Sequence, residues 1–348
     1  MKTLLIAALA FTAATPADEV QGMLDKLVTD DKATAALIRV ENKAGTWTAA
    51  AGTRSLGSKA PARADGHFRI GSVTKTFAAT VIMQLVDEGK VRLDAPVSTY
   101  LGEQVKGAAT VRQVLNHTSG LYDYMHEAGY STNRWRGKDR FRHYEPAGLL
   151  KVADKGGHRE PGKAWSYSNT NYVVAGMIIE KVTGRPYGKE VERRILRPLR
   201  LNQTSVPGDR PGVPYPHARG YEPVDGKMTD ATRMNPSLDG AAGEMISTTR
   251  DLNRFTKALL TGKLTSAKSL AAMRTTEDTK AGFGYGLGLQ KYPLPCGKAA
   301  WGHSGELIGY LTFSFTTDDG ATMTLSLNPG TEKASTADLF GIAAKALC

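Results

Sequence analysis

The sequence is poor in the residues that build metal sites. It contains only two cysteines and seven histidines among 348 residues, and the histidines are scattered along the chain. None of these residues has the spacing of a metal-binding motif. We therefore expect neither a metal site nor a cofactor.

Long apolar runs are absent after the first residues. Met1–Ala17 holds one basic residue, Lys2, then an apolar run over 4–14 and small residues at its end, which is the pattern of a signal peptide. This run is too short to span a bilayer comfortably, and no later segment is long or apolar enough. We expect a secreted protein, extracellular or associated with the cell wall, without an integral membrane segment.

Acidic residues are fewer than basic ones. The 45 Lys and Arg against 34 Asp and Glu give a formal net charge of +11, which falls to +10 when Lys2 leaves with the signal peptide. No basic cluster is interleaved with aromatic residues, so we expect no nucleic-acid binding. The positive charge could favour an anionic cell wall or substrate, or it could be solvated surface. Internal repeats are not evident, and we expect a monomer.

The two cysteines are Cys296 and the C-terminal Cys348. An even number in an exported protein favours a disulfide, which here would pin the last helix to a sheet. Two free thiols are the alternative.

The most informative motif is Ser72-x-x-Lys75 at the start of an amphipathic segment. Three residues apart on a helix, the two side chains lie on one face. A neighbouring base activates a serine hydroxyl, and a nearby ammonium and the helix N-terminus favour a developing alkoxide. Alone, the pattern also fits a helix-start serine followed by a surface lysine.

Two triplets strengthen the catalytic interpretation. Tyr167-Ser168-Asn169 follows a Pro-Gly turn and precedes a helix-like run, and His303-Ser304-Gly305 precedes alternating strand residues. Each taken alone also fits an ordinary structural role, a capping loop and a turn between strands. Their order and spacing match the S-x-x-K, [YS]-x-N and [KH]-[ST]-G set of penicillin-recognising enzymes.

From about His67 to Cys348 the chain therefore resembles the serine beta-lactamase and D-alanyl-D-alanine carboxypeptidase superfamily, in its class C-like branch of secreted D,D-peptidases. The stretches at residues 67–72, 111–121 and 284–289 add to this resemblance. It implies an α/β (α+β) fold, an antiparallel sheet flanked by helices plus a mainly helical lobe. The active site would lie between the lobes.

The sequence pattern agrees with this fold. Alternating residues predict a hairpin over 35–40 and 47–51, and strands over 285–289, 307–316 and 322–327, with a closing helix over 336–347. The residues between are mainly helical. We predict a catalytic unit over 18–348, with a sheet lobe over about 18–89 and 284–348 and a helical lobe over about 90–283.

The resemblance implies acyl transfer through an ester of Ser72. Lys75 and Tyr167 would share the role of proton acceptor, with nearby cations favouring the Tyr167 phenolate, and Tyr167 would then return a proton to the leaving group. Backbone N–H groups of Ser72 and Glu306 would bind the oxyanion, and Asn169 the acyl-side amide. His303 could orient Tyr167 or bind an anion when protonated.

The leaving-group side departs from the carboxypeptidase pattern, because the strand positions expected to bind a free carboxylate carry Gln290 and Glu306. A glutamate there would repel a carboxylate and favour a neutral or cationic leaving group. Lys291 or Lys298 could still bind the carboxylate. The basic segment Tyr130–His143 is either a flap that recognises acidic substrates or a solvated loop.

Three functions remain open from the sequence. The first is a D,D-carboxypeptidase or related D-amino-acid peptidase, and the second is an esterase, D-amino-acid amidase or beta-lactamase. The third is a non-catalytic penicillin-binding receptor. The expected partners are a small peptide, amide, ester or beta-lactam substrate, with peptidoglycan as a further candidate.

Overall fold

The computed structural model describes residues 15–131 and 135–348. Its main element is an antiparallel sheet with strand order β2-β1-β12-β11-β10-β9-β8-β7. The strands are β1 (Ala33–Asn42), β2 (Gly45–Gly52), β7 (Glu277–Asp278), β8 (Gly284–Tyr285), β9 (Gln290–Pro293), β10 (Ala299–Leu307), β11 (Tyr310–Thr317) and β12 (Thr322–Pro329). Strands from both ends of the sequence therefore pair in one sheet, as predicted.

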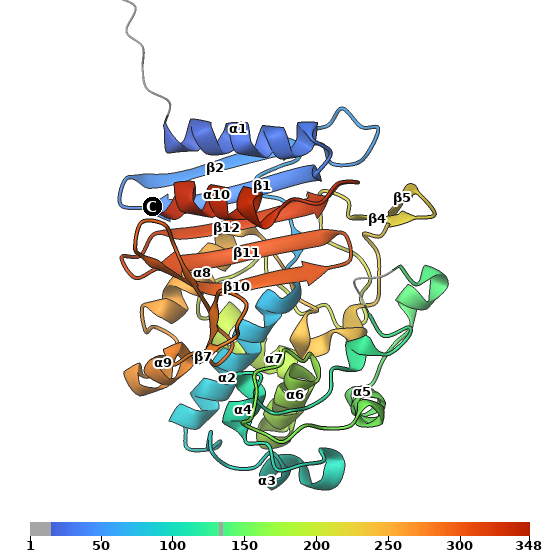
Figure 1. Cartoon of the computed structure of the whole chain (residues 1–348), viewed down its shortest axis with the longest axis vertical. Coiled ribbons are helices and arrows are strands. Elements are labelled where there is room, and N and C mark those ends of the chain that lie inside the picture. The colour runs from blue at the N-terminus through green and yellow to red at the C-terminus, as the bar shows by residue number, and fades with distance from the viewer. Residues whose placement is uncertain (1–14, 132–134) are drawn as a thin grey trace, which may run out of the picture.

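Helices cover both faces of this sheet. In Figure 1, α10 (Thr336–Leu347) lies in front of the sheet and α8 (Thr249–Leu260) behind it, while α1 (Pro16–Thr29) lies beside β2. Side chains of β11 alternate between the two faces. Ser314 bonds Thr256 of α8 at 2.9 Å between the hydroxyl oxygens, whereas Phe315 belongs to the apolar cluster that includes residues of α1 and α10.

The remaining helices lie on the α8 side, below the sheet in Figure 1. They are α2 (Thr74–Asp87), α3 (Ser98–Leu101), α4 (Val111–Leu115), α5 (Pro146–Ala153), α6 (Thr170–Thr183), α7 (Tyr187–Val191) and α9 (Ala267–Arg274). Two small sheets pair β3 (Phe68–Arg69) with β6 (Ile246–Ser247) and β4 (Tyr221–Val224) with β5 (Lys227–Asp230).

Helix α2 connects the sheet to the helical part. It packs on α6, α7 and α9, and its Phe77 stacks on Phe255 of α8 with ring centroids 3.6 Å apart. One apolar core consequently includes residues of the sheet and of these helices. The division into two lobes at about residue 89 stays a prediction.

Several predicted elements are confirmed. The hairpin over β1 and β2 closes at Asn42 and Gly45, and the closing helix α10 has the predicted bounds. The prediction of a strand over 285–289 is wrong beyond Tyr285, because Gly288 adopts a φ of 73° where the chain passes close to α2. The predicted run over 307–316 is two strands, because the chain turns at Gly309 with a φ of 74°.

At the N-terminal end, the structure describes the chain from Thr15 onward. Residues 1–14 of the predicted signal peptide lie outside the described residues, and Thr15 caps α1 through a reciprocal pair of bonds with Asp18. Among the described residues, no helix has the length and apolar character needed to cross a membrane.

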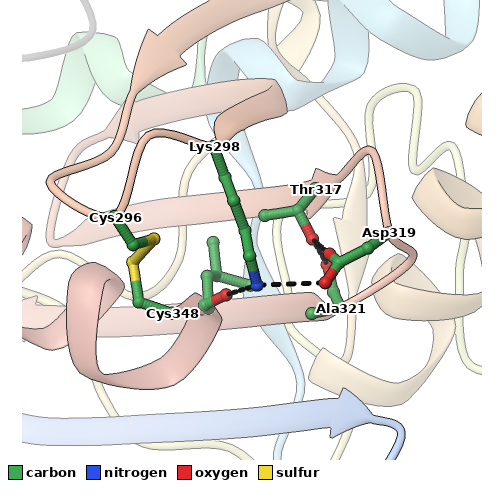
Figure 2. The surroundings of a disulfide bond; sticks show 7 residues. Cys296, Lys298, Thr317, Asp319, Ala321 and Cys348 are labelled. Atoms are coloured by element: carbon green, nitrogen blue, oxygen red, sulfur yellow. Dashed lines mark hydrogen bonds and ion pairs between the residues drawn. A yellow bond between two sulfur atoms is a disulfide. The ribbon is translucent and has the colours of Figure 1, made fainter.

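The predicted disulfide between Cys296 and Cys348 is confirmed (Figure 2), with a Cα–Cα distance of 5.9 Å. Lys298 adds a second connection beside it. Its Nζ donates to the Leu347 carbonyl at 3.2 Å and forms an ion pair with Asp319 at 3.0 Å. The C-terminal end of α10 is thereby held to the sheet.

Candidate active site

Ser72 lies in a 3-10 turn, Gly71–Val73, that leads directly into α2. Two glycines let this turn touch β10. A Cβ on Gly71 would lie 2.7 Å from the Glu306 nitrogen, and one on Gly305 would lie 2.0 Å from the Ile70 oxygen and 2.9 Å from the Ser72 nitrogen. The backbone amides of Ser72 and Glu306 therefore meet at this junction, and their role as oxyanion donors stays a prediction.

Lys75 is fully buried one helical turn after Ser72. Its Nζ lies 3.0 Å from the Ser72 Oγ, 2.8 Å from the Asn169 Oδ1 and 2.7 Å from the Ala242 carbonyl oxygen. Burial lowers the pKa of Lys75 to about 7, with the charges of Asp123 and Asp239 acting in the opposite direction. A substantial fraction of Lys75 is consequently a neutral amine near neutral pH.

The contacts of Lys75 fix the direction of its lone pair. A neutral amine has two N–H donors, which the Asn169 Oδ1 and the Ala242 carbonyl accept. The lone pair of the amine, which occupies the remaining position on Nζ, then points to the Ser72 Oγ. Neutral Lys75 is thus oriented to accept the proton of the Ser72 hydroxyl.

Tyr167 approaches the same hydroxyl from the loop before α6. Its phenol donates to the Ser72 Oγ at 2.8 Å, and the Lys75 Nζ lies 4.9 Å from the centroid of its ring. Although the side chain borders the cleft, burial raises the pKa of Tyr167 above its usual value. This shift disfavours the expected Tyr167 phenolate, and the roles of Tyr167 and Lys75 in proton transfer stay predictions.

Asn169 immediately precedes α6 and connects Lys75 to an acidic residue. Its Oδ1 accepts from Lys75, and its Nδ2 donates to the Asp123 Oδ2 at 2.9 Å. The Asp123 Oδ1 in turn accepts the Met125 backbone N–H at 3.0 Å. This chain fixes the Asn169 amide beside the nucleophile, and its contact with the acyl side of a substrate stays a prediction.

His303 has different partners from those expected. It is buried on β10, where its Nδ1 donates to the Ser304 carbonyl and its Nε2 accepts from the Tyr285 hydroxyl at 2.8 Å. Burial, followed by the nearby Lys75 charge, lowers the pKa of His303 to about 3. His303 is neutral and bonded to Tyr285, so the expectation that it orients Tyr167 or supplies a cation is corrected.

His117 packs against Tyr167 in a way that the sequence analysis missed. It lies just after α4 with a φ of 64° and stacks on Tyr167 with ring centroids 4.2 Å apart. Its Nδ1 accepts from the Ser168 backbone N–H at 3.2 Å and from the Asn171 side chain at 3.0 Å. Nothing in the one-dimensional pattern indicated this stacking.

The nucleophile opens into a cavity of about 280 Å³. The lining residues are Ser72, Met125, Tyr167, Asn169, Asp239, Ala242, Gly243, Gln290, His303, Ser304, Gly305, Glu306, Leu311 and Phe313. Among the described residues, this set contains two carboxylates and neither arginine nor lysine. Lys75 lies behind Ser72 and is buried.

The candidate residues on the leaving-group side lie as follows. Gln290 accepts the Ser304 backbone N–H at 2.8 Å, and the exposed Glu306 faces the cleft at the end of β10. Loss of surrounding water raises the pKa of Glu306, which Lys333 opposes. Lys291 lies over the Trp301 ring, 5.2 Å from its centroid, and Lys298 is held beside the disulfide. The structure therefore corrects the idea that either lysine binds a carboxylate in the cleft.

The segment 130–143 does not border this cavity at any described residue, and its residues 132–134 lie outside the described part. Arg140 donates to the Asp230 carbonyl at 3.0 Å and stacks over Trp135 at 4.3 Å. These contacts do not support the flap hypothesis.

Comparisons with known proteins agree with this geometry. A family model described as Beta-lactamase matches residues 20–346. A D-stereospecific amidohydrolase from Streptomyces sp. is 39% identical, with a TM-score of 0.86 over 93% of this chain and 97% of that structure. A D-amino acid amidase from Ochrobactrum anthropi SV3, complexed with L-phenylalanine amide, is 30% identical, with a TM-score of 0.82 over 95% and 96%.

A curated relative, penicillin-binding protein 4* of Bacillus subtilis, is 30% identical over 75% of this chain. The chain spans 60% of that relative's length and 61% of the length of PbpX from the same organism. With its family model matched over nearly the whole length and its serine, lysine and tyrosine assembled around one cleft, the chain belongs to the beta-lactamase family of serine hydrolases.

Proposed function

We propose that the protein is a D-stereospecific amidohydrolase that cleaves amides and esters of D-amino acids. Its preferred substrates have a leaving group without a free carboxylate. The observation that carries this proposal is the charge of the cleft, where Asp239 and Glu306 line the wall and no lysine or arginine among the described residues does.

The sign of this charge separates two kinds of substrate. A carboxylate about 4 Å from Glu306 would be repelled by about 1 kcal/mol in water and by about 4 kcal/mol at a partly desolvated site. A D,D-carboxypeptidase substrate carries such a carboxylate on its leaving D-alanine. An amino acid amide has a leaving group without a carboxylate, so Glu306 does not repel it. The names of the Streptomyces and Ochrobactrum relatives support the D-amino-acid preference.

The residues around Ser72 support an acyl-enzyme mechanism. The Ser72 Oγ attacks the substrate carbonyl as its proton passes to the neutral Lys75 amine. Collapse of the tetrahedral intermediate breaks the bond to the leaving nitrogen or oxygen, which takes a proton from Tyr167. The proton held by Lys75 restores the Tyr167 phenol. Water then attacks the ester by the same proton transfers in reverse, releasing the acid and free Ser72.

A substrate panel tests this proposal with purified enzyme and the Ser72→Ala variant as control. The panel contains D-alaninamide, L-alaninamide, a D-Ala-D-Ala peptide, a short acyl ester and a chromogenic cephalosporin. We expect the highest kcat/KM for D-alaninamide and no turnover by the variant. A higher kcat/KM for the D-Ala-D-Ala peptide would instead support a D,D-carboxypeptidase, and preference for L-alaninamide would contradict the stereochemical assignment.

We also propose that the protein is exported before it acts. The signal-peptide pattern of Met1–Ala17 and the Cys296–Cys348 disulfide support this, because disulfides persist in oxidising compartments. N-terminal sequencing of protein recovered from the culture medium should begin near residue 18. Recovery only from the cell interior with Met1 retained would contradict export.

A further inference from the structure

A second cavity of about 490 Å³ lies beside the catalytic cleft, between the outer face of the sheet and α10. Aromatic and aliphatic side chains make up most of its wall, and no charged residue among the described ones lines it. Four of these aromatic residues, Phe283, Tyr292, Phe313 and Phe340, remain partly exposed. Apolar surface of this kind on a folded protein usually marks a binding site.

The second cavity adjoins the catalytic cleft at Phe313, which lines both. Phe313 lies on β11 and pairs across the strands with Ser304 of the His-Ser-Gly triplet. Tyr292 also lines the second cavity, and its hydroxyl lies near the side chain of the same Ser304. A substrate group that extends from the cleft past Ser304 is therefore directed toward the aromatic cavity.

Aromatic contacts also connect the cavity wall to the catalytic tyrosine. Trp165 lies edge-on to Phe283 with ring centroids 6.0 Å apart and contacts Tyr167 at 6.4 Å. Phe283 stacks on Tyr292 at 4.9 Å, and Tyr292 packs edge-on against Phe340 at 5.6 Å. Tyr167 delivers the proton to the leaving group, so this row of rings begins on the leaving-group side of Ser72. Asn169, expected on the acyl side, does not line the second cavity.

The helical wall of the cavity is firmly anchored. Ser335 and Asp338 cap the start of α10 reciprocally, and the Cys296–Cys348 disulfide holds its end to the sheet (Figure 2). The cavity thus keeps its shape without a bound ligand, and binding there requires little ordering of the protein.

We propose that this cavity is a leaving-group subsite that binds an aromatic ring attached to the departing nitrogen or oxygen of the substrate. The proposal rests on the acyl-transfer function and adds the class of its leaving group. An apolar cavity of about 150 Å³ can hold benzene, so the available space accommodates a phenyl ring with its linker. The preferred substrates are then arylalkyl amides or esters, and peptides with an aromatic residue after the scissile bond.

The test compares D-alanine benzylamide with D-alaninamide in the wild type and in three variants. Phe340→Ala removes one aromatic wall, and Ala343→Phe fills the cavity from α10 without removing an apolar contact. Leu56→Ala is the control, since Leu56 is an exposed apolar residue outside both cavities. The two amides differ in intrinsic chemical reactivity, but this difference is the same for every protein. It therefore cancels when the ratio of kcat/KM for the benzylamide to kcat/KM for D-alaninamide is compared between the wild type and the variants.

We expect the wild type and Leu56→Ala to favour the benzylamide at least tenfold, mainly through a lower KM. Phe340→Ala and Ala343→Phe should each reduce this ratio several-fold, with circular dichroism and melting temperature showing that the protein is folded. If one variant fails to fold, the other still decides. No benzyl preference in the wild type, or an unchanged ratio in a folded variant of either kind, would overturn the subsite.

The ratio of kcat/KM for benzyl acetate to kcat/KM for ethyl acetate is measured as well. The acyl group of these esters carries no D-amino acid. Benzyl preference with the acetates and no cleavage of D-amino acid amides would overturn the proposed amidohydrolase function and keep the subsite. Cleavage of the D-amino acid amides without benzyl preference would instead overturn the subsite and keep the proposed amidohydrolase function. Cleavage of neither series would overturn both.

Discussion

Raising the pH should switch on acylation of Ser72 by deprotonating Lys75. Burial lowers the pKa of this lysine from 10.5 to about 7, which corresponds to roughly 5 kcal/mol lost by the ammonium relative to the amine. The amine is the form that can accept the serine proton. The rate should therefore be low below the pKa and should rise as the pH passes through it.

The other two ionisable side chains beside Ser72, Tyr167 and His303, do not change protonation near neutral pH, so the pH dependence reports on Lys75. The pKa of Tyr167 is raised by burial, so its phenol stays protonated, and His303 with a pKa of about 3 stays neutral. For a pKa of about 7, the amine fraction of Lys75 is about 9% at about pH 6 and about 91% at about pH 8. The acylation rate should thus rise roughly tenfold over this interval and level off above it.

A neutral acetate ester is the suitable substrate, because it does not titrate and a charged substrate would respond to Glu306. The measurement is kcat/KM under conditions where acylation limits turnover, from about pH 5 to about pH 9. Lys75→Arg keeps a permanent positive charge and should lose about two to four orders of magnitude at every pH. A flat profile, or one rising only near the ordinary lysine pKa, would refute the assignment of Lys75 as the proton acceptor.

Three further perturbations test the account. Tyr167→Phe should slow acylation by at least about two orders of magnitude with little change in melting temperature, because the leaving group loses its proton donor; near-normal turnover would remove Tyr167 from the mechanism. Glu306→Gln should raise kcat/KM for a D-Ala-D-Ala peptide relative to D-alaninamide by at least about fivefold, since it removes a like charge of about 1 kcal/mol; a constant ratio would contradict the charge argument. Replacing Cys296 and Cys348 by serine should lower the free energy of unfolding by about 4 kcal/mol, because a closed loop of 52 residues is released. Urea denaturation measures this loss, and a change below about 1 kcal/mol would contradict it.

The sequence predicted those parts of the site that depend on local spacing. Ser72 and Lys75 are one helical turn apart, so a helix start alone brings them together. The hairpin over β1 and β2 and the helix α10 also follow from local periodicity. Tyr167 and Asn169 come from a distant segment, and only the resemblance of the motif set placed them beside Ser72.

The protonation states could not be predicted from the sequence. They depend on how completely α2, α6 and β10 enclose the ionisable groups, which no local pattern encodes. This enclosure changes how the two residues are expected to share proton transfer, because it makes Lys75 a better acceptor and Tyr167 a weaker acid. The neutral state of His303 and its bond to Tyr285 follow from the same burial.

The aromatic cavity was equally hidden in the sequence. Phe283, Tyr292, Phe313 and Phe340 are spread over 58 positions and read individually as ordinary core residues. Antiparallel pairing of β10 with β11 and the position of α10 bring them to one face beside Ser304. A contact set of this kind is defined only by the register of the strands.

The most direct test of the central claim is to identify the residue that becomes acylated. Purified protein is incubated with a fluorescent penicillin, digested, and its labelled peptide mapped by mass spectrometry. The account predicts one adduct on Ser72, within the peptide containing Ser72 and Lys75, and no label on Ser72→Ala. An adduct on another residue, or undiminished labelling of the variant, would contradict it.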